Sequence, residues 1–92
     1  METLLSNQTS NGSGATVNIT DGGFRLLRIY GIFDGATATL EYDFHGSGTW
    51  VPDSAGAYTV ADTSPITVKT GLQIRITVSG VGGSTSLNAE LI

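Results

Sequence analysis

The chain has 92 residues, including 13 Gly, 13 Thr and 9 Ser, and only 13% of its residues are charged, with a formal net charge of −4. The absence of Cys excludes thiol enzymes, disulfide scaffolds and Cys-ligated zinc sites. Four basic residues argue against a nucleic-acid binder that depends on phosphate contacts. No apolar run approaches the roughly 18 residues of a membrane span, so we expect neither nucleic acid nor membrane as a partner.

The N-terminal segment does not show the pattern of a strand. Two adjacent leucines are followed by a polar stretch that contains Asn, Ser and Gly. Such a segment either packs on its own domain or extends to neighbouring chains, and its composition favours the second. We therefore divide the chain into an N-terminal extended arm over residues 1–14 and a β-sandwich domain over residues 15–92. The candidate partner-binding residues of the arm are Glu2, Leu4, Leu5 and Asn7.

The segment 24–33 is apolar on both faces of a predicted strand, which is typical of a strand that is covered on both sides or lies at an interface. Leu27 and Ile29 lie on one face. The other face carries three further candidate partner-binding residues, Phe24, Leu26 and Tyr30. Asp34-Gly35 follows and predicts a hairpin with a type I′ turn.

Strict alternation of apolar and polar residues over 36–44, 72–79 and 84–92 predicts half-buried strands. In the first of them Glu41 and Asp43 belong to the polar face. The predicted core comprises Leu40, Tyr42, Phe44, Leu72, Ile74, Ile76, Val78 and Leu87. With turn signals every 8–12 residues, the pattern predicts an all-β protein, an antiparallel β-sandwich or jelly roll of seven to eight short strands.

No constellation of residues supports catalysis. His45 is the single histidine and is placed in a Gly-rich turn, where a solvated side chain is expected. Asp34, Asp43, Asp53 and Asp62 recur with the period of the strands and turns, so turn chemistry accounts for them better than calcium, which needs six to eight converging oxygens. We expect no enzyme, no metal and no cofactor.

Aromatic residues leave one alternative open. Trp50 follows a Gly-rich turn and either closes one end of the sandwich or forms an exposed aromatic rim together with Tyr58. An exposed rim would suit contact with carbohydrate or protein.

Several segments resemble a group of small tailed-phage virion proteins. The resemblance covers roughly residues 15–92 and includes a G-x-F-D-G-A-T-x-x-L stretch at 31–40, an aromatic residue after a Gly-rich turn at 48–52, and a closing V-S-G-x-G-G-S-T-S-L stretch at 78–87. It implies a structural role in a phage particle and carries no catalytic residues.

The expected function is therefore that of a non-enzymatic capsid decoration, or cement, protein. Such a protein would be made in the host cytoplasm and would bind and stabilise the major capsid shell on the outer surface of the phage head. The expected partners are the major capsid protein and copies of the same chain, as a trimer or through lattice contacts. The alternative is a tail or fibre module that binds protein or carbohydrate.

Overall fold

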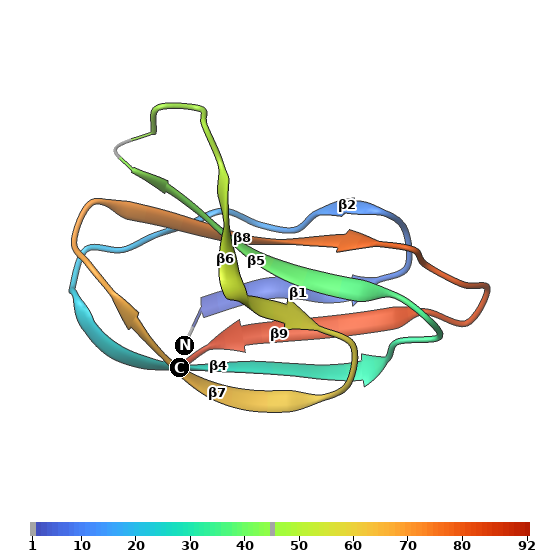
Figure 1. Cartoon of the computed structure of the whole chain (residues 1–92). Helices are drawn as coiled ribbons and strands as arrows, with labels where there is room; N and C mark the ends of the chain where they lie inside the picture. The colour runs from blue at the N-terminus through green and yellow to red at the C-terminus, as the bar shows by residue number, and fades with distance from the viewer. Residues whose placement is uncertain (1, 45) are drawn as a thin grey trace.

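The computed structural model describes residues 2–44 and 46–92, which form nine antiparallel strands in two sheets and no helix (Figure 1). The strands are β1 (Glu2–Gln8), β2 (Gly12–Ser13), β3 (Val17–Asn18), β4 (Gly23–Ile32), β5 (Thr37–Phe44), β6 (Val51–Tyr58), β7 (Asp62–Val68), β8 (Leu72–Ser79) and β9 (Ser86–Leu91). The predicted all-β sandwich is confirmed.

The order of the strands is that of a jelly roll. Sheet A has the order β1-β9-β4-β7, and sheet B has the order β2-β8-β5-β6, with β3 also pairing β8. Gly12 lies opposite Val78 and Val17 lies opposite Ile74, so β2 and β3 are two pieces of one interrupted edge strand. The pairs β1:β9, β2/β3:β8, β4:β7 and β5:β6 therefore alternate between the sheets, as in a long antiparallel ribbon rolled into a sandwich.

The Asp34-Gly35 turn forms as predicted, but it does not make a hairpin. Both residues have positive φ, 45° and 83°, and the Ala36 N–H donates to the Phe33 carbonyl at 2.9 Å. Positive φ at both central positions is the geometry of a type I′ turn. The turn joins β4 in sheet A to β5 in sheet B, so it carries the chain from one layer of the sandwich to the other.

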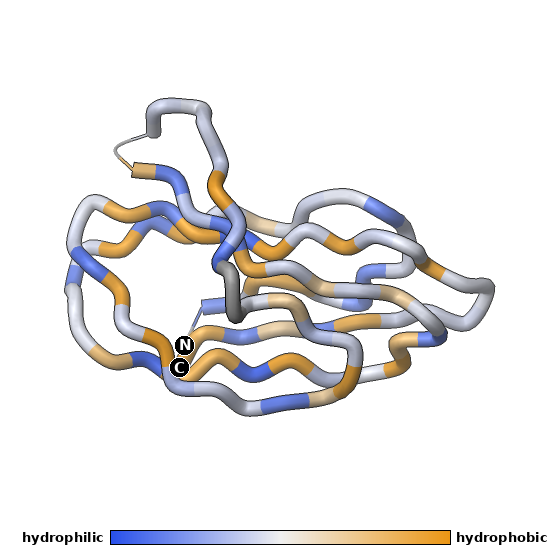
Figure 2. Tube along the Cα trace, in the orientation of Figure 1, coloured by the Kyte–Doolittle hydropathy of each residue, from blue (hydrophilic) through white to orange (hydrophobic). Residues whose placement is uncertain are grey.

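Alternating apolar residues from both sheets fill the space between them. The alternation is visible along the strands in Figure 2. The largest fully buried side chains are Leu4, Leu27, Ile29, Leu40, Ile74, Ile76, Leu87, Leu91, Val68, Val78 and Asp43. The alternation in β8 and β9 thus predicts the correct inner face for both strands.

The end of β5 departs from the predicted alternation. Phe44 was expected in the core but is 59% exposed, and Tyr42 is only partly buried. Asp43, expected on the solvated face, is 2% exposed. Its carboxylate accepts hydrogen bonds from the Ser47 hydroxyl and, at 3.0 Å, from the Gly48 N–H, so the turn that follows β5 covers it. A buried carboxylate is tolerated here because donors satisfy it.

The N-terminal segment is part of the sandwich, and the division of the chain at residue 14 is wrong. Residues 2–8 form β1, which pairs with β9 from Glu2 opposite Leu91 onward. Leu4 and Leu5 are both buried in the core of the chain itself. The Leu4 carbonyl also accepts a hydrogen bond from the Ala15 N–H at 3.0 Å, which closes this side of the sandwich between the two sheets.

Candidate binding surfaces

An exposed apolar patch lies on the outer face of sheet A. It consists of Phe24, Leu26, Pro65 and Ile92. Leu26 in β4 lies opposite Pro65 in β7, and on its other side it exchanges two backbone hydrogen bonds with Ile92, of 2.8 and 3.3 Å. Phe24 lies two residues before Leu26 on the same face and is 82% exposed, while Leu26 and Ile92 are 44% and 49% exposed. The four side chains therefore form one continuous surface.

A polar group on the same face borders this apolar patch. The Tyr30 hydroxyl donates to the Glu90 carboxylate at 2.9 Å, and the Arg28 guanidinium lies 4.6 Å from the centre of the Tyr30 ring. The hydrogen bond to Glu90 is the main cause that raises the pKa of Tyr30, so the phenol keeps its proton at neutral pH. These contacts hold the side chains of Arg28, Tyr30 and Glu90 in place, which lowers the entropy cost of ordering this group in an interface.

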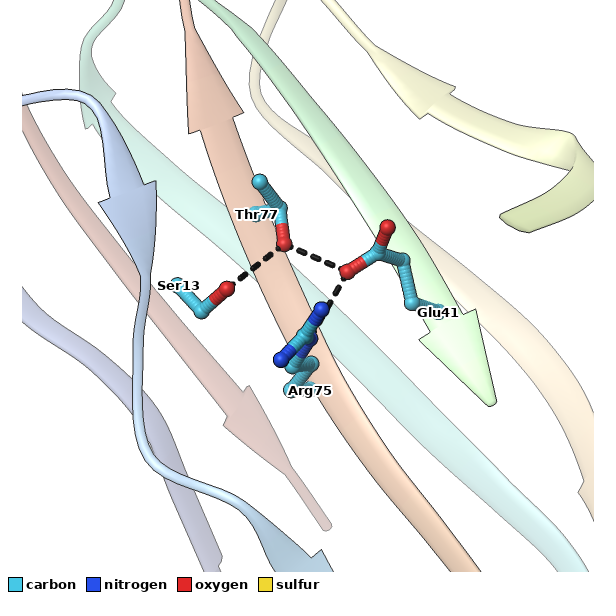
Figure 3. A network of polar contacts seen from close by, with 4 residues as sticks. All are labelled: Ser13, Glu41, Arg75 and Thr77. Atoms are coloured by element: carbon cyan, nitrogen blue, oxygen red, sulfur yellow. Dashed lines mark hydrogen bonds and ion pairs between the residues drawn. The ribbon is translucent and has the colours of Figure 1, made fainter. Parts of the chain in front are cut away.

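The outer face of sheet B is polar and is tied together by hydrogen bonds (Figure 3). Glu41 accepts from the Arg75 guanidinium at 2.8 Å and from the Thr77 hydroxyl, which is also within 2.9 Å of the Ser13 hydroxyl. Burial would raise the pKa of Glu41, but the hydrogen bonds from Thr77 and Arg75 outweigh it and hold this pKa below its ordinary value. The Glu41 carboxylate is thus satisfied by neighbours on the same face and is charged at neutral pH.

The two aromatic residues of the expected rim lie on opposite faces of sheet B. Trp50 is half-buried, and the Arg75 guanidinium lies over its ring at 4.1 Å on the outer face. Tyr58 lies opposite Ala38 and packs against the core on the inner face. A shared aromatic rim of these residues is therefore wrong, and one face of the indole is occupied by Arg75.

The structure separates the four candidate residues of the N-terminal segment. Leu4 and Leu5 are core residues and are not accessible to a neighbouring chain. Glu2 and Asn7 are exposed on β1 at the edge of sheet A. Asn7 has a positive φ of 47°, and its N–H donates to the Asn88 side-chain carbonyl at 3.0 Å. Only the polar members of this set are on the surface.

The regularly spaced aspartates serve separate local structures. Asp34 accepts from the Ser84 N–H, Asp43 from Ser47, and Asp62 from the N–H of the residue that follows it. The Ser47 hydrogen bond is the main cause that lowers the pKa of Asp43. Within residues 2–44 and 46–92, no three His, Cys, Asp or Glu side chains come together as metal ligands.

His45 lies outside the described residues. The described part of the chain contains no helix that could span a bilayer. Comparison with protein-family models, curated proteins and solved structures finds no match to this chain.

Sequence reasoning missed Pro65, Ile92 and Glu90 as members of the exposed face of sheet A. Phe24, Leu26 and Tyr30 could be found because their strand is apolar on both faces. The other three join them only through the pairing of β4 with β7 and β9, which no local pattern encodes. A strand-pairing prediction for β4 would be the signal needed to find them.

Proposed function

We propose that this protein is a non-enzymatic structural protein of a phage virion that decorates the capsid and docks on the shell through the outer face of sheet A. The docking surface is proposed from one observation, the exposed apolar patch with Phe24 at its edge. The virion setting rests on the sequence resemblance over residues 15–92. Jelly rolls are also common among capsid domains, which supports this setting by analogy of fold alone.

The chemistry of the patch fits a protein partner. A buried aromatic side chain removes about 150–250 Å² of surface from water and is a frequent centre of binding energy. Phe24 presents most of its ring to solvent, and the neighbouring Leu26, Pro65 and Ile92 enlarge the apolar area. The polar side chains of Arg28 and its neighbours then form a rim, in the arrangement typical of protein interfaces.

The small size of the patch is the reason to propose attachment by many linked copies. A stable interface of standard size buries about 800 Å² on each partner, which is more than four side chains supply. Copies that contact one another on the shell are linked, so each further docking contact becomes effectively intramolecular and avidity adds to the affinity of the single patch. The proposal therefore includes self-contacts between neighbouring copies on the shell, with the major capsid protein beneath them.

The test is decoration of purified heads that lack this protein. The wild-type chain should co-sediment with heads and not with tails, and Phe24→Asp should lose at least tenfold in occupancy at equal salt. Val60→Asp is the matched control, because Val60 is 69% exposed and lies in the link between β6 and β7, off the patch. Full occupancy with Phe24→Asp would overturn the docking surface, and recovery with tails would favour the tail or fibre module instead.

A further inference from the structure

A lateral groove runs along the side of the sandwich opposite the hydrogen bond between Leu4 and Ala15. Here the edge strands β6 of sheet B and β7 of sheet A face each other. Two adjoining hollows of about 240 and about 230 Å³ share Tyr42 and Thr67. The residues that bear on the argument are Tyr42, Phe44, Asp53, Tyr58, Ser64 and Lys69.

A bulge in β6 brings a carboxylate to this groove. Thr39 lies opposite Ala57 and Glu41 lies opposite Pro52, so β6 has three more residues than β5 between the same two pairs. Bulges of this kind redirect side chains and are frequent beside functional sites. The redirected side chain is that of Asp53, which accepts a hydrogen bond of 2.7 Å from the Tyr42 hydroxyl.

Gly56 is required for this placement. A Cβ at Gly56 would lie 2.9 Å from the Asp53 Cβ and 3.0 Å from the Leu40 Cβ. The bulged strand therefore packs closely over the core with the carboxylate held in position. Burial and the hydrogen bond to Asp53 raise the pKa of Tyr42, so its hydroxyl remains a donor to the carboxylate at neutral pH.

We infer that the lateral groove binds a neutral hexopyranose, such as the terminal ring of a glycan. A sugar ring has an apolar C–H face that packs on aromatic rings and hydroxyls that donate to a carboxylate. One hollow of the groove is lined by Tyr42 and Tyr58, which carry the rings, by Asp53, which carries the carboxylate, and by Ser64. An ionised carboxylate has about four acceptor sites, so Asp53 accepts a ligand hydroxyl beside the donors of the protein itself, of which the Tyr42 hydroxyl is one.

The charges around the groove select against other ligands. Asp53 repels phosphate and carboxylate groups at the more polar hollow. Lys69 lines the adjoining hollow and disfavours a cation that would otherwise pack on the aromatic rings. Taken together, the two hollows have a volume within the range of small-ligand sites, which begins at about 300 Å³. A small, uncharged and hydroxyl-rich ring satisfies these conditions, and this inference does not depend on the proposed function.

The experiment is a titration of the isotope-labelled full chain by NMR with the methyl glycosides of glucose, galactose, mannose and N-acetylglucosamine. At least one of these should give saturable shifts at Tyr42, Tyr58 and Ser64, with a millimolar Kd. Asp53→Asn should weaken binding at least tenfold. Asp62 is an exposed residue of β7 that does not line the groove, so the Asp62→Asn variant should bind like the wild type.

Choline chloride and sodium phosphate serve as comparison ligands. Saturable binding of either one at the groove in place of the sugars would overturn the inference, and so would the absence of saturable shifts with all four glycosides. If Asp53→Asn loses the dispersed spectrum of a folded chain, Tyr58→Leu is the second variant and Tyr58→Phe its control. Tyr58→Phe keeps the ring and should bind like the wild type, whereas Tyr58→Leu keeps an apolar side chain against the core and removes the ring, so we expect a severalfold weaker Kd for Tyr58→Leu. Unchanged affinity of a folded Tyr58→Leu chain would overturn the inference.

Discussion

The Ser84 N–H donates a hydrogen bond of 2.9 Å to the Asp34 carboxylate and so joins two links that both cross between the sheets. Asp34 belongs to the link from β4 to β5, and Ser84 belongs to the link from β8 to β9. A second contact, from the Thr85 hydroxyl to the Phe33 carbonyl at 2.8 Å, lies beside it. One end of the jelly roll is therefore closed by two loops that satisfy the polar groups of each other.

Substitution of Gly82 tests this closure. A Cβ at Gly82 would lie 2.3 Å from the Asp34 Oδ2 and 2.6 Å from the Asp34 carbonyl oxygen, so Gly82→Ala must push the two links apart. We expect a loss of about 1–3 kcal/mol in the free energy of unfolding, as for other overpacked sites. A chain of this size then loses about 4–8 °C in Tm for each kcal/mol.

Gly83→Ala is the matched control for this substitution. A Cβ at Gly83 meets nothing within 4 Å, so thermal unfolding should be unchanged within about 0.5 kcal/mol. Equal melting temperatures for Gly82→Ala and Gly83→Ala would show that the two links do not pack together as described.

The sequence predicts the faces of the central strands because their environment is uniform. In β8 each inward position is apolar and each outward position is polar, so a register error would expose the whole apolar set. The type I′ turn at Asp34-Gly35 is also predictable, because it depends on two neighbouring residues. Which sheet each flanking strand joins is not predictable from the turn, because it depends on the pairing of β4 with β7 and β9.

Irregular strands explain why other predictions fail. Leu4 and Leu5 are adjacent, and a regular strand would bury only one of them. Shifts in register on both sides of Leu5 in β1 are the irregularity that lets both side chains reach the core. The bulge in β6 likewise turns Asp53 toward the lateral groove, although its sequence position suggested a turn residue. Bulges insert residues without a periodic signal, so pattern analysis does not locate them.

The burial of Leu4 leads to a prediction about stability. Leu4→Ala should lower the free energy of unfolding by about 2–5 kcal/mol, because the side chain is fully buried and its removal leaves a cavity. Thr3→Ala, at an exposed neighbouring position, should change it by less than about 0.5 kcal/mol. Urea unfolding followed by Trp50 fluorescence measures both. Equal stability of the two variants would show that Leu4 is not part of the core and that residues 1–14 form a separate arm.

Acid should destabilise the fold through Glu41 and Asp43. The pKa of each carboxyl is lowered in the folded chain, so each contributes stability above its unfolded pKa of about 4 that is lost as pH falls through the folded pKa. Urea midpoints measured from pH 7 down to pH 3 should therefore decline most steeply below about pH 4.5. Glu41→Gln and Asp43→Asn should each flatten this decline, and an unaltered pH profile in both would contradict the assignment.

Phe44 and Ile74 were both expected in the core, and matched substitutions distinguish them. Ile74 is fully buried at the centre of β8, so Ile74→Asn places an amide without partners between the sheets and removes an apolar side chain. We expect a loss of about 3–5 kcal/mol, enough to unfold much of a marginally stable domain. Phe44 is 59% exposed at the end of β5, so Phe44→Asn should cost no more than about 1 kcal/mol. Circular dichroism melting curves report both variants, and a Phe44→Asn chain that unfolds as readily as Ile74→Asn would show that the alternation of β5 continues to its last residue.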